Sequence, residues 1–493
     1  MLSELIAARL DRAAADTLSG QVYDAIRQLI LHTALKPGQR LPSSRQLAQD
    51  LGLGRNTVID AYLRLVDEGY VASRVGAGSF VASTLPESQL HAAPAGAGKR
   101  PRRAPVRTAL SARGQAILDE TVIWEGGGFA PCVPELSEFP FQVWQRLLNK
   151  AWRQMRLSDT RYGEPGGHPE LRAAIAEHVQ LARQVRCQPH QVVIVNGAQH
   201  GIDLCARLLA DAGERVWMED PGYPGARRVF HAANLELVPI RLDNDGMAPT
   251  ARHWKQPPRL IYITPSHQFP TGVVMSLRRR RELLEAAARH GSWIIEDDYD
   301  GEFRFAGKPI ASLQGIADAQ QVIYLGTFSK VLFPGLRLGY LVLPESIAER
   351  FAQASAQLGF EGRQVTQAAL AAFMREGYFA AHIRRMRMVY AQRGELLSQV
   401  WRKELGKLAA QAPLSGADTG MHMIAELPAG IDRAVSAAAL EQGVVAQSLS
   451  NLFYGKPNRS GLVLGYGAVH EQEIRRQGTL LARLVRQALT RRQ

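Results

Sequence analysis

Hydrophobic positions divide the chain into a short helical stretch and a long alternation of strands and helices. Over residues 15–83, apolar side chains recur at helical spacing in three segments, whose expected starts are Ser19, Ser43 and Arg55. Two apolar runs around Gly76-Ala77-Gly78 then predict a short β-hairpin. Two short helices joined by a tight turn and followed by a hairpin are typical of a winged helix-turn-helix domain.

The third segment would be the recognition helix, which enters the major groove of double-stranded DNA by its N-terminus. Its first residues can contact base edges and phosphates, and polar residues before it and in the wing would reach the DNA backbone. Each of these residues alone could be an ordinary solvated side chain, but together they predict DNA binding. The expected DNA-binding residues are Arg45, Arg55, Asn56, Thr57, Arg74 and Ser79.

Residues 84–120 are expected to form a flexible, basic linker. The stretch is rich in Ala, Pro and Gly and lacks apolar periodicity, and no acidic residue lies between His91 and Arg113. A solvated tether is one interpretation. The other is that its arginines and lysine contact DNA phosphates regardless of sequence and make binding sensitive to salt.

Residues 121–493 alternate apolar strands with helical patterns, which predicts an α/β domain with a mostly parallel sheet covered on both faces. Open sheets of this kind bind ligands beyond the carboxyl ends of their strands. One such end carries Asp297 and Tyr299, and another carries Lys330. A lysine amine forms a Schiff base with an aldehyde, and a carboxylate facing a pyridine nitrogen keeps that nitrogen protonated. Tyr299, two residues after Asp297, faces the same side and can donate to a phenolic oxygen.

The same chemistry needs a phosphate site and an aromatic face. Thr327, Ser329 and Arg337 offer hydroxyls and a guanidinium, and the helix expected to begin at Ala198 and Gln199 offers free backbone N–H groups. Tyr223 follows another apolar strand and offers a ring for stacking. The constellation therefore predicts pyridoxal 5′-phosphate as the cofactor.

Composition and charge agree with this division. The chain has 493 residues, enough for two or three folding units, and its formal net charge of +13 favours an anionic partner. Its three cysteines form no C-x-x-C pair, so neither a disulfide framework nor a metal site is expected. Charged residues interrupt the start of the chain, and no apolar run is long enough to span a bilayer. A cytoplasmic protein without membrane contact is expected.

Two stretches carry a resemblance to known families. Residues 35–45, 55–58 and 65–70 resemble the winged helix of the GntR regulators, and the chain from about residue 125 onwards resembles the fold-type I aminotransferases. Together with residues 264–272 and 326–340, they resemble the MocR/GabR-like branch of the GntR family.

The resemblance implies a mostly parallel sheet, a smaller C-terminal α+β part and a homodimer. Tyr162 lies in a Tyr-Gly…Gly-His-Pro-Glu-Leu-Arg pattern, and in the resembling enzymes this tyrosine reaches the cofactor phosphate of the partner subunit. A dimer with two winged helices implies an operator with two half-sites.

The chain departs from working aminotransferases at two positions. Phe269 stands where they carry an asparagine for the ring oxygen, and Val463 stands where they carry the arginine that holds the substrate carboxylate. Arg227, Arg363 and His422 are candidate substitutes for that arginine. No residue is therefore assigned a catalytic role.

The leading hypothesis is a transcriptional regulator that binds pyridoxal 5′-phosphate and senses the cofactor itself or a small amine, amino acid or sulfonate. One alternative is an aminotransferase with an accessory DNA-binding domain. Another is an amino-acid-binding module with a vestigial cofactor site. The absence of the carboxylate arginine favours the regulator, and the effector and the operator sequence stay open.

Overall fold

The chain forms two compact units, Met1–Thr108 and Ala109–Gln493, which are described separately. The computed structural model describes residues 2–11, 16–32, 34–74, 78–83, 110–119, 127–157, 161, 163–305, 311–316, 320–359 and 362–491.

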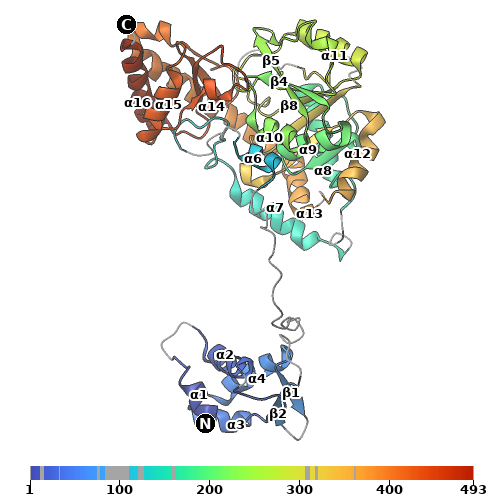
Figure 1. Ribbon diagram of the computed structural model, residues 1–493, viewed down its shortest axis with the longest axis vertical. Helices are drawn as coiled ribbons and strands as arrows, with labels where there is room; N and C mark the ends of the chain where they lie inside the picture. Colours follow the sequence, from blue (N-terminus) through green and yellow to red (C-terminus); the bar gives the residue numbers. More distant parts are fainter. Residues whose placement is uncertain are drawn as a thin grey trace, which may run out of the picture. The chain divides into compact units, whose positions relative to one another are not determined.

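The first unit consists of helices followed by a hairpin (Figure 1). Its elements are α1 (Leu2–Ala7), α2 (Leu18–Leu31), α3 (Ser44–Leu51), α4 (Arg55–Asp67), β1 (Val71–Arg74) and β2 (Gly78–Val81). The apolar stripes of α2, α3 and α4 meet in one core, in which Val22, Leu47 and Leu65 are fully buried. The hairpin pairs Val71 with Val81 and Arg74 with Gly78. This arrangement matches the predicted winged helix-turn-helix.

The helix caps of this unit confirm one expectation and correct another. Ser43 caps α3 and accepts a hydrogen bond from the backbone N–H of Gln46 at 3.2 Å. The prediction that Ser19 caps α2 is wrong, because Thr17 has the extended backbone of a cap and its hydroxyl accepts from the Gly20 N–H at 3.2 Å.

An eight-stranded sheet forms the centre of the second unit, in the order β3-β10-β9-β8-β7-β4-β5-β6. All neighbours from β9 to β5 are parallel, whereas β10 runs antiparallel to β9 and β3. The mostly parallel sheet was therefore predicted correctly. Its strands are β3 (Val192–Val195), β4 (Arg215–Asp220), β5 (Glu236–Asp243), β6 (Gly246–Met247), β7 (Leu260–Ile263), β8 (Trp293–Asp298), β9 (Val322–Thr327) and β10 (Gly339–Val342).

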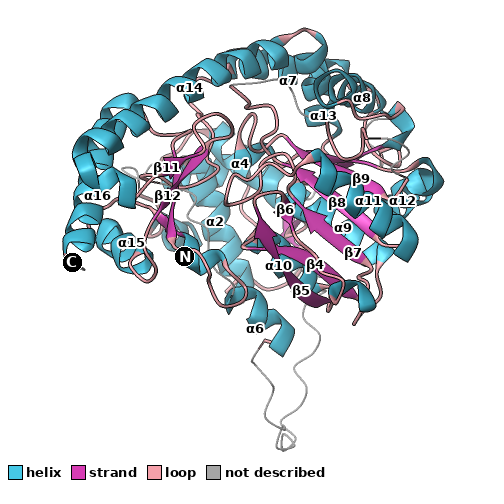
Figure 2. Cartoon of the chain, turned by 90° about the horizontal axis from the view of Figure 1, so that it is seen from above, coloured by secondary structure: helices cyan, strands magenta, loops and turns pink. Residues whose placement is uncertain are grey.

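Helices cover both faces of this sheet (Figure 2). Tyr262 packs on one face with residues of α9 and α10, and its neighbour Ile261 packs on the other face with residues of α11. This alternation follows from the two-residue period of a strand. The helices around the sheet are α8 (Pro169–Arg183), α9 (Ala198–Leu209), α10 (Pro224–Ala232), α11 (Leu277–His290), α12 (Glu345–Gln357) and α13 (Gln364–Arg375).

The C-terminal part is a smaller α+β layer, as the resemblance implied. It contains a four-stranded antiparallel sheet in the order β11-β12-β14-β13. Its elements are α14 (Tyr378–Leu405), β11 (Leu414–Ser415), β12 (His422–Glu426), α15 (Asp432–Glu441), β13 (Gln447–Ser448), β14 (Gly461–Gly465) and α16 (Glu471–Thr490).

The end of the predicted linker is helical rather than irregular. Helix α6 (Ala112–Asp119) begins after Ser111, whose hydroxyl accepts from the Gly114 N–H at 3.0 Å, and it packs against α10. The capped first turn and the contact with α10 stabilise a helix that composition alone did not predict. Residues 84–109 and residue 120 of the predicted linker lie outside the described residues.

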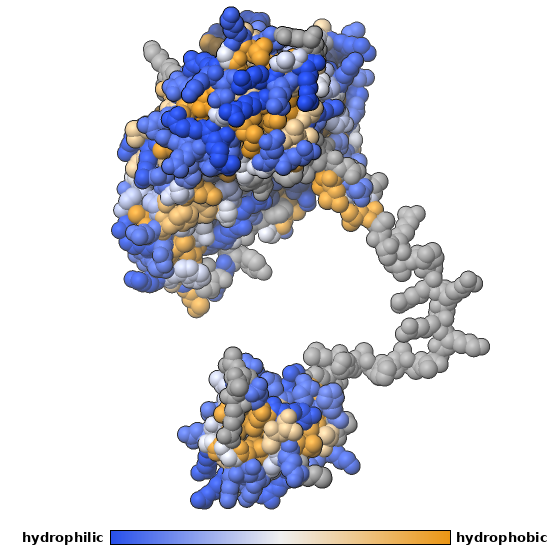
Figure 3. Space-filling model, turned by 90° about the vertical axis from the view of Figure 1, so that its left-hand side faces the viewer, coloured by the Kyte–Doolittle hydropathy of each residue, from blue (hydrophilic) through white to orange (hydrophobic). Residues whose placement is uncertain are grey.

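The three cysteines, Cys132, Cys187 and Cys205, are all free and buried. Hydrophilic side chains dominate the face of the larger unit seen in Figure 3. Within the described ranges, no helix combines the length and hydropathy needed to cross a bilayer.

Candidate functional site

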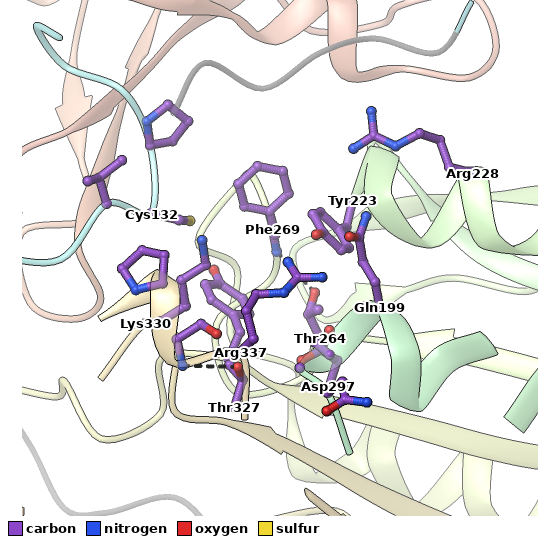
Figure 4. Close-up of a pocket in the computed structure, with 18 of the residues that line it drawn as sticks. Cys132, Gln199, Tyr223, Arg228, Thr264, Phe269, Asp297, Thr327, Lys330 and Arg337 are labelled. Carbon is purple, nitrogen blue, oxygen red and sulfur yellow. Dashed lines mark hydrogen bonds between the residues drawn. The ribbon is translucent and has the colours of Figure 1, made fainter. Parts of the chain in front are cut away.

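A cavity of about 330 Å³ opens at the carboxyl ends of β3, β4, β7, β8 and β9. Parallel strands bring these ends to one edge of the sheet, so residues distant in sequence meet there. Figure 4 shows Lys330, Asp297 and Tyr223 around this space. Every predicted cofactor residue that the structure describes lines it: Ala198, Gln199, Tyr223, Asp297, Tyr299, Thr327, Ser329, Lys330 and Arg337. The predicted contact Tyr162 lies outside the described residues.

Asp297 is the most informative of these residues. Its Oδ2 accepts a hydrogen bond from the Tyr262 hydroxyl at 2.6 Å, while its Oδ1 is buried without a hydrogen-bond partner among the described residues. Burial, helped by the neighbouring carboxylates of Asp298 and Asp300, raises the pKa of Asp297 to about 7, although Tyr262 and Lys330 oppose the shift. A buried acceptor without a partner is costly, so the site suits a ligand that brings a protonated nitrogen to Oδ1.

Backbone and side-chain donors also line the cavity. Helix α9 begins there after Gly197, and the first N–H groups of a helix have no partner within it. Arg337 lies close by with a left-handed backbone, φ 49°. Arg363 Nη1 supports this conformation by donating to the carbonyls of Leu336 and Arg337, at 3.1 and 3.0 Å. The free N–H groups and the guanidinium suit a phosphate dianion.

The candidate substitutes for the carboxylate arginine lie elsewhere. Arg363 is engaged with the backbone, and Arg227 is buried on α10 with its guanidinium 6.0 Å from the Tyr454 ring centroid. His422 Nε2 lies 3.0 Å from the Pro270 carbonyl, and burial lowers the pKa of His422 to about 3, so this histidine is neutral. Of the side chains described around the cavity, none belongs to these three residues.

The position expected for the carboxylate arginine is apolar. Val463 is fully buried in a cluster with Cys132, Phe269 and Tyr299 beside the cavity. A substrate carboxylate would therefore meet an apolar surface instead of a guanidinium at this position. Val463 itself packs behind Cys132, Phe269 and Tyr299, which line the cavity.

Several lining residues were not found from the sequence. Tyr262 and Thr264 come from the end of β7, Arg228 comes from α10, and Cys132 comes from a loop before α7 (Phe141–Gln154). Tyr262 could have been noticed as a polar group inside the buried run Leu260–Ile263. No sequence signal distinguishes Arg228 from Arg227, because the rotation of α10 against the sheet determines which of the two arginines lines the cavity.

In the first unit, the predicted DNA-binding residues lie at the ends of elements. Arg55 and Asn56 are exposed in the first turn of α4, which begins after Gly54, and Thr57 is half-buried beside them. Arg45 is exposed at the start of α3, and the predicted wing residues Arg74 and Ser79 belong to β1 and β2.

Two contacts hold this surface in place. The Tyr62 hydroxyl donates to the Pro42 carbonyl at 2.9 Å and so ties α4 to the segment before α3. In the wing, the Arg74 guanidinium lies 5.1 Å from the Phe80 ring centroid. A helix N-terminus with exposed Arg and Asn side chains suits phosphates and base edges.

Comparison with known proteins separates the same two units. Residues 18–81 match the gntR family of bacterial regulatory proteins, and residues 134–459 match the aminotransferase class I and II family.

Relatives share the whole architecture. The chain is 39% identical over 469 residues to the probable rhizopine catabolism regulatory protein MocR of Rhizobium meliloti, covering 94% of this chain and 93% of that protein. It is 29% identical over 457 residues to the pyridoxine biosynthesis transcriptional regulator PdxR of Corynebacterium glutamicum, covering 92% and 93%.

A solved structure matches the second unit. The α-aminoadipate aminotransferase LysN of Thermus thermophilus, complexed with N-(5′-phosphopyridoxyl)-L-leucine, superimposes with a TM-score of 0.65 at 25% identity, covering 77% of this chain and 96% of LysN. The chain therefore belongs to the MocR/GabR-like branch of the GntR transcriptional regulators, in which a DNA-binding winged helix and an aminotransferase class I and II domain form one polypeptide.

Proposed function

We propose that this regulator holds pyridoxal 5′-phosphate through Lys330 and that the occupant of the cavity controls its binding to DNA. The observation that carries the proposal is the buried Asp297 Oδ1, which has no partner among the described residues and lines the same cavity as Lys330. When bound, the cofactor supplies an aldehyde that a lysine amine can hold covalently and a ring nitrogen that an acid can keep protonated.

The lining residues fit the remaining parts of this cofactor. Tyr223 would stack on the ring, and Tyr299 would donate to its phenolic oxygen. The N–H groups at the start of α9 would bind the phosphate. Thr327, Ser329 and Arg337 line the cavity and would add hydroxyls and a guanidinium to that phosphate site.

A regulator is favoured over a working aminotransferase because the buried, apolar Val463 occupies the position expected for the carboxylate arginine. Arg228 nevertheless offers a cation to the cavity, so a small effector with an anionic group, such as an amino acid or a sulfonate, fits beside the cofactor. If the cofactor itself is the signal, no cation for a separate effector is needed in the cavity.

Footprinting of the DNA upstream of the gene, with cofactor-stripped and reloaded protein, tests the proposal. A ligand shifts a conformational equilibrium only through different affinities for the two states. We expect the protected region or the affinity to differ between stripped and loaded protein, and Lys330→Ala protein to give one pattern under both conditions. Identical protection by stripped and reloaded wild-type protein would exclude the cofactor itself as the signal.

We further propose that two copies form a dimer through the second unit and bind an operator with two half-sites, direct or inverted. The pattern that contains Tyr162 resembles the dimer-interface motif of the aminotransferases. Large exposed apolar side chains also support an interface, since Trp152 in the last turn of α7 is 61% exposed and Leu157, three residues after α7, is 82% exposed. A partner subunit would bury such side chains.

Deletion of residues 1–83 should leave a dimer that still binds the cofactor, because the cavity and the apolar side chains of α7 both belong to the second unit. Light scattering coupled to size-exclusion chromatography measures the mass, and visible absorbance measures the cofactor. A monomeric product would mean that the dimer interface lies in the first unit instead.

A further inference from the structure

A buried hydrogen-bonded chain lies behind Tyr299, outside the lining of the cavity. His267 follows β7, and Asp300 follows β8. The Nδ1 atom of His267 lies 2.8 Å from Asp300 Oδ2 and 3.1 Å from the Tyr299 hydroxyl. The side chains of His267 and Asp300 are only 1% and 2% exposed, so no bulk water competes for these contacts.

The partners of His267 indicate which of its nitrogens carries the proton. Its Nε2 is buried without a hydrogen-bond partner among the described residues, whereas Nδ1 faces a carboxylate. A buried N–H without an acceptor is rarer and costlier than a buried lone pair, so the network favours the tautomer with hydrogen on Nδ1. This N–H donates to Asp300, and the Tyr299 oxygen lies close enough to accept part of the same interaction.

This tautomer determines the direction of the Tyr299 hydroxyl. Because Nδ1 already carries a hydrogen, Tyr299 cannot donate to it and must direct its own proton elsewhere. Tyr299 lines the cavity, so the cavity is the open direction for its O–H.

The surrounding chain is shaped to hold the imidazole in place. Gly420 has φ +75°, and a Cβ there would lie 2.2 Å from His267 Cε1 and 2.7 Å from Asp300 Oδ2. The His422 ring lies against His267 with ring centroids 4.9 Å apart. Ligand atoms of His267, Asp300 and His422 come within 4.8 Å of one another, but His422 Nε2 faces the Pro270 carbonyl and His267 Nδ1 faces Asp300. Hydrogen bonds therefore already engage His267 Nδ1, the Asp300 carboxylate and His422 Nε2.

We propose that His267 is a positioning residue that, through Tyr299, orients a hydroxyl donor onto the phenolic oxygen of the cofactor. The proposal rests on the cofactor site proposed above. A donor at this oxygen stabilises its negative form. Without the donor, the proton shared by the phenolic oxygen and the lysine nitrogen is retained to higher pH.

Other charged and titratable groups around Tyr299 act on the same equilibrium. They are Asp297, Asp300, Cys132 and Tyr262, of which Asp297, Cys132 and Tyr262 also line the cavity. The variants for the test must therefore change His267 and leave these four groups unaltered.

Two substitutions of His267 separate positioning from packing. His267→Asn places an amide N–H near the position of Nδ1, whereas His267→Gln places it near Nε2, away from Tyr299. The readout is the pH midpoint of the visible band of the cofactor-loaded full-length protein. We expect His267→Gln to raise this midpoint by about one pH unit, and His267→Asn to stay close to the wild type.

A double substitution shows whether the effect passes through Tyr299. Tyr299→Phe alone should raise the midpoint at least as much as His267→Gln does. Adding His267→Gln to Tyr299→Phe should not raise the midpoint further, because the two residues act as one unit. Equal midpoints for His267→Gln and wild type would overturn the proposal, and so would equal shifts for His267→Asn and His267→Gln.

Failure of this proposal can be distinguished from failure of the cofactor site. If wild-type protein showed no visible band, the cofactor site itself would be wrong. If His267→Gln does not fold, His267→Leu replaces it, since leucine fills part of the space of the imidazole, offers no N–H to Asp300 or Tyr299, and leaves Asp300 unaltered. An unchanged midpoint in the folded His267→Leu protein would likewise overturn the role of His267.

Discussion

Lys330→Ala should abolish the visible absorbance of the cofactor-loaded protein and leave its fold intact. Lys330 is the lysine among the described lining residues of the cavity, and the visible band requires a covalent bond between its amine and the cofactor aldehyde. The residue follows β9 and is only half-buried, so its truncation removes no core packing. Absorbance after dialysis against cofactor-free buffer measures the effect, and thermal unfolding checks the fold.

Lys403→Ala is the matched control, because Lys403 is an exposed lysine in the last turn of α14. This variant should keep the full visible band. Retention of the band by Lys330→Ala protein would show that another amine holds the cofactor.

Arg55→Ala should weaken binding to the specific operator by about 1–3 kcal/mol, the size expected for loss of a base contact. Arg55 is exposed in the first turn of α4, at the end of this helix that we expect to enter the major groove. Binding to the operator and to random DNA of equal length, each at several salt concentrations, separates base contacts from phosphate contacts.

Arg9→Ala serves as the control for charge, because Arg9 is an exposed arginine of the same unit outside the helix-turn-helix. The Arg9→Ala protein should bind both the operator and random DNA with nearly wild-type affinity. If Arg55→Ala instead lost equal affinity for operator and random DNA, Arg55 would be a phosphate contact and would not read the sequence.

Sequence patterns predicted those parts of the site that depend on strand ends. Asp297, Tyr299 and Lys330 follow apolar runs, and a parallel sheet necessarily brings such ends together. The α3 cap at Ser43 was predictable for a similar reason, since a cap depends on residues only three apart in the chain.

Features that depend on tertiary packing were not predictable. Arg227 and Arg228 are adjacent, and only the rotation of α10 on the sheet decides that Arg228 faces the cavity. The partner of Asp297, Tyr262, comes from the neighbouring strand, and no periodicity assigns one buried hydroxyl to one carboxylate. Helix α6 was missed because contact with α10 stabilises it, and a single short segment gives no sign of such a contact.

The position of α6 also opens a route for site-specific labelling. Helix α10, on which α6 packs, starts directly after Tyr223 and carries Arg228 to the cavity. Leu118 on α6 is 65% exposed, whereas all three cysteines of the chain are buried, and burial raises the pKa of the Cys132 thiol to about 12 and that of Cys187 to about 11. A maleimide dye reacts with accessible thiolates, so Leu118→Cys would accept it selectively without removal of any native cysteine. A fluorophore there would follow movements of α10 from outside the cavity, in a protein whose cofactor site stays chemically unaltered.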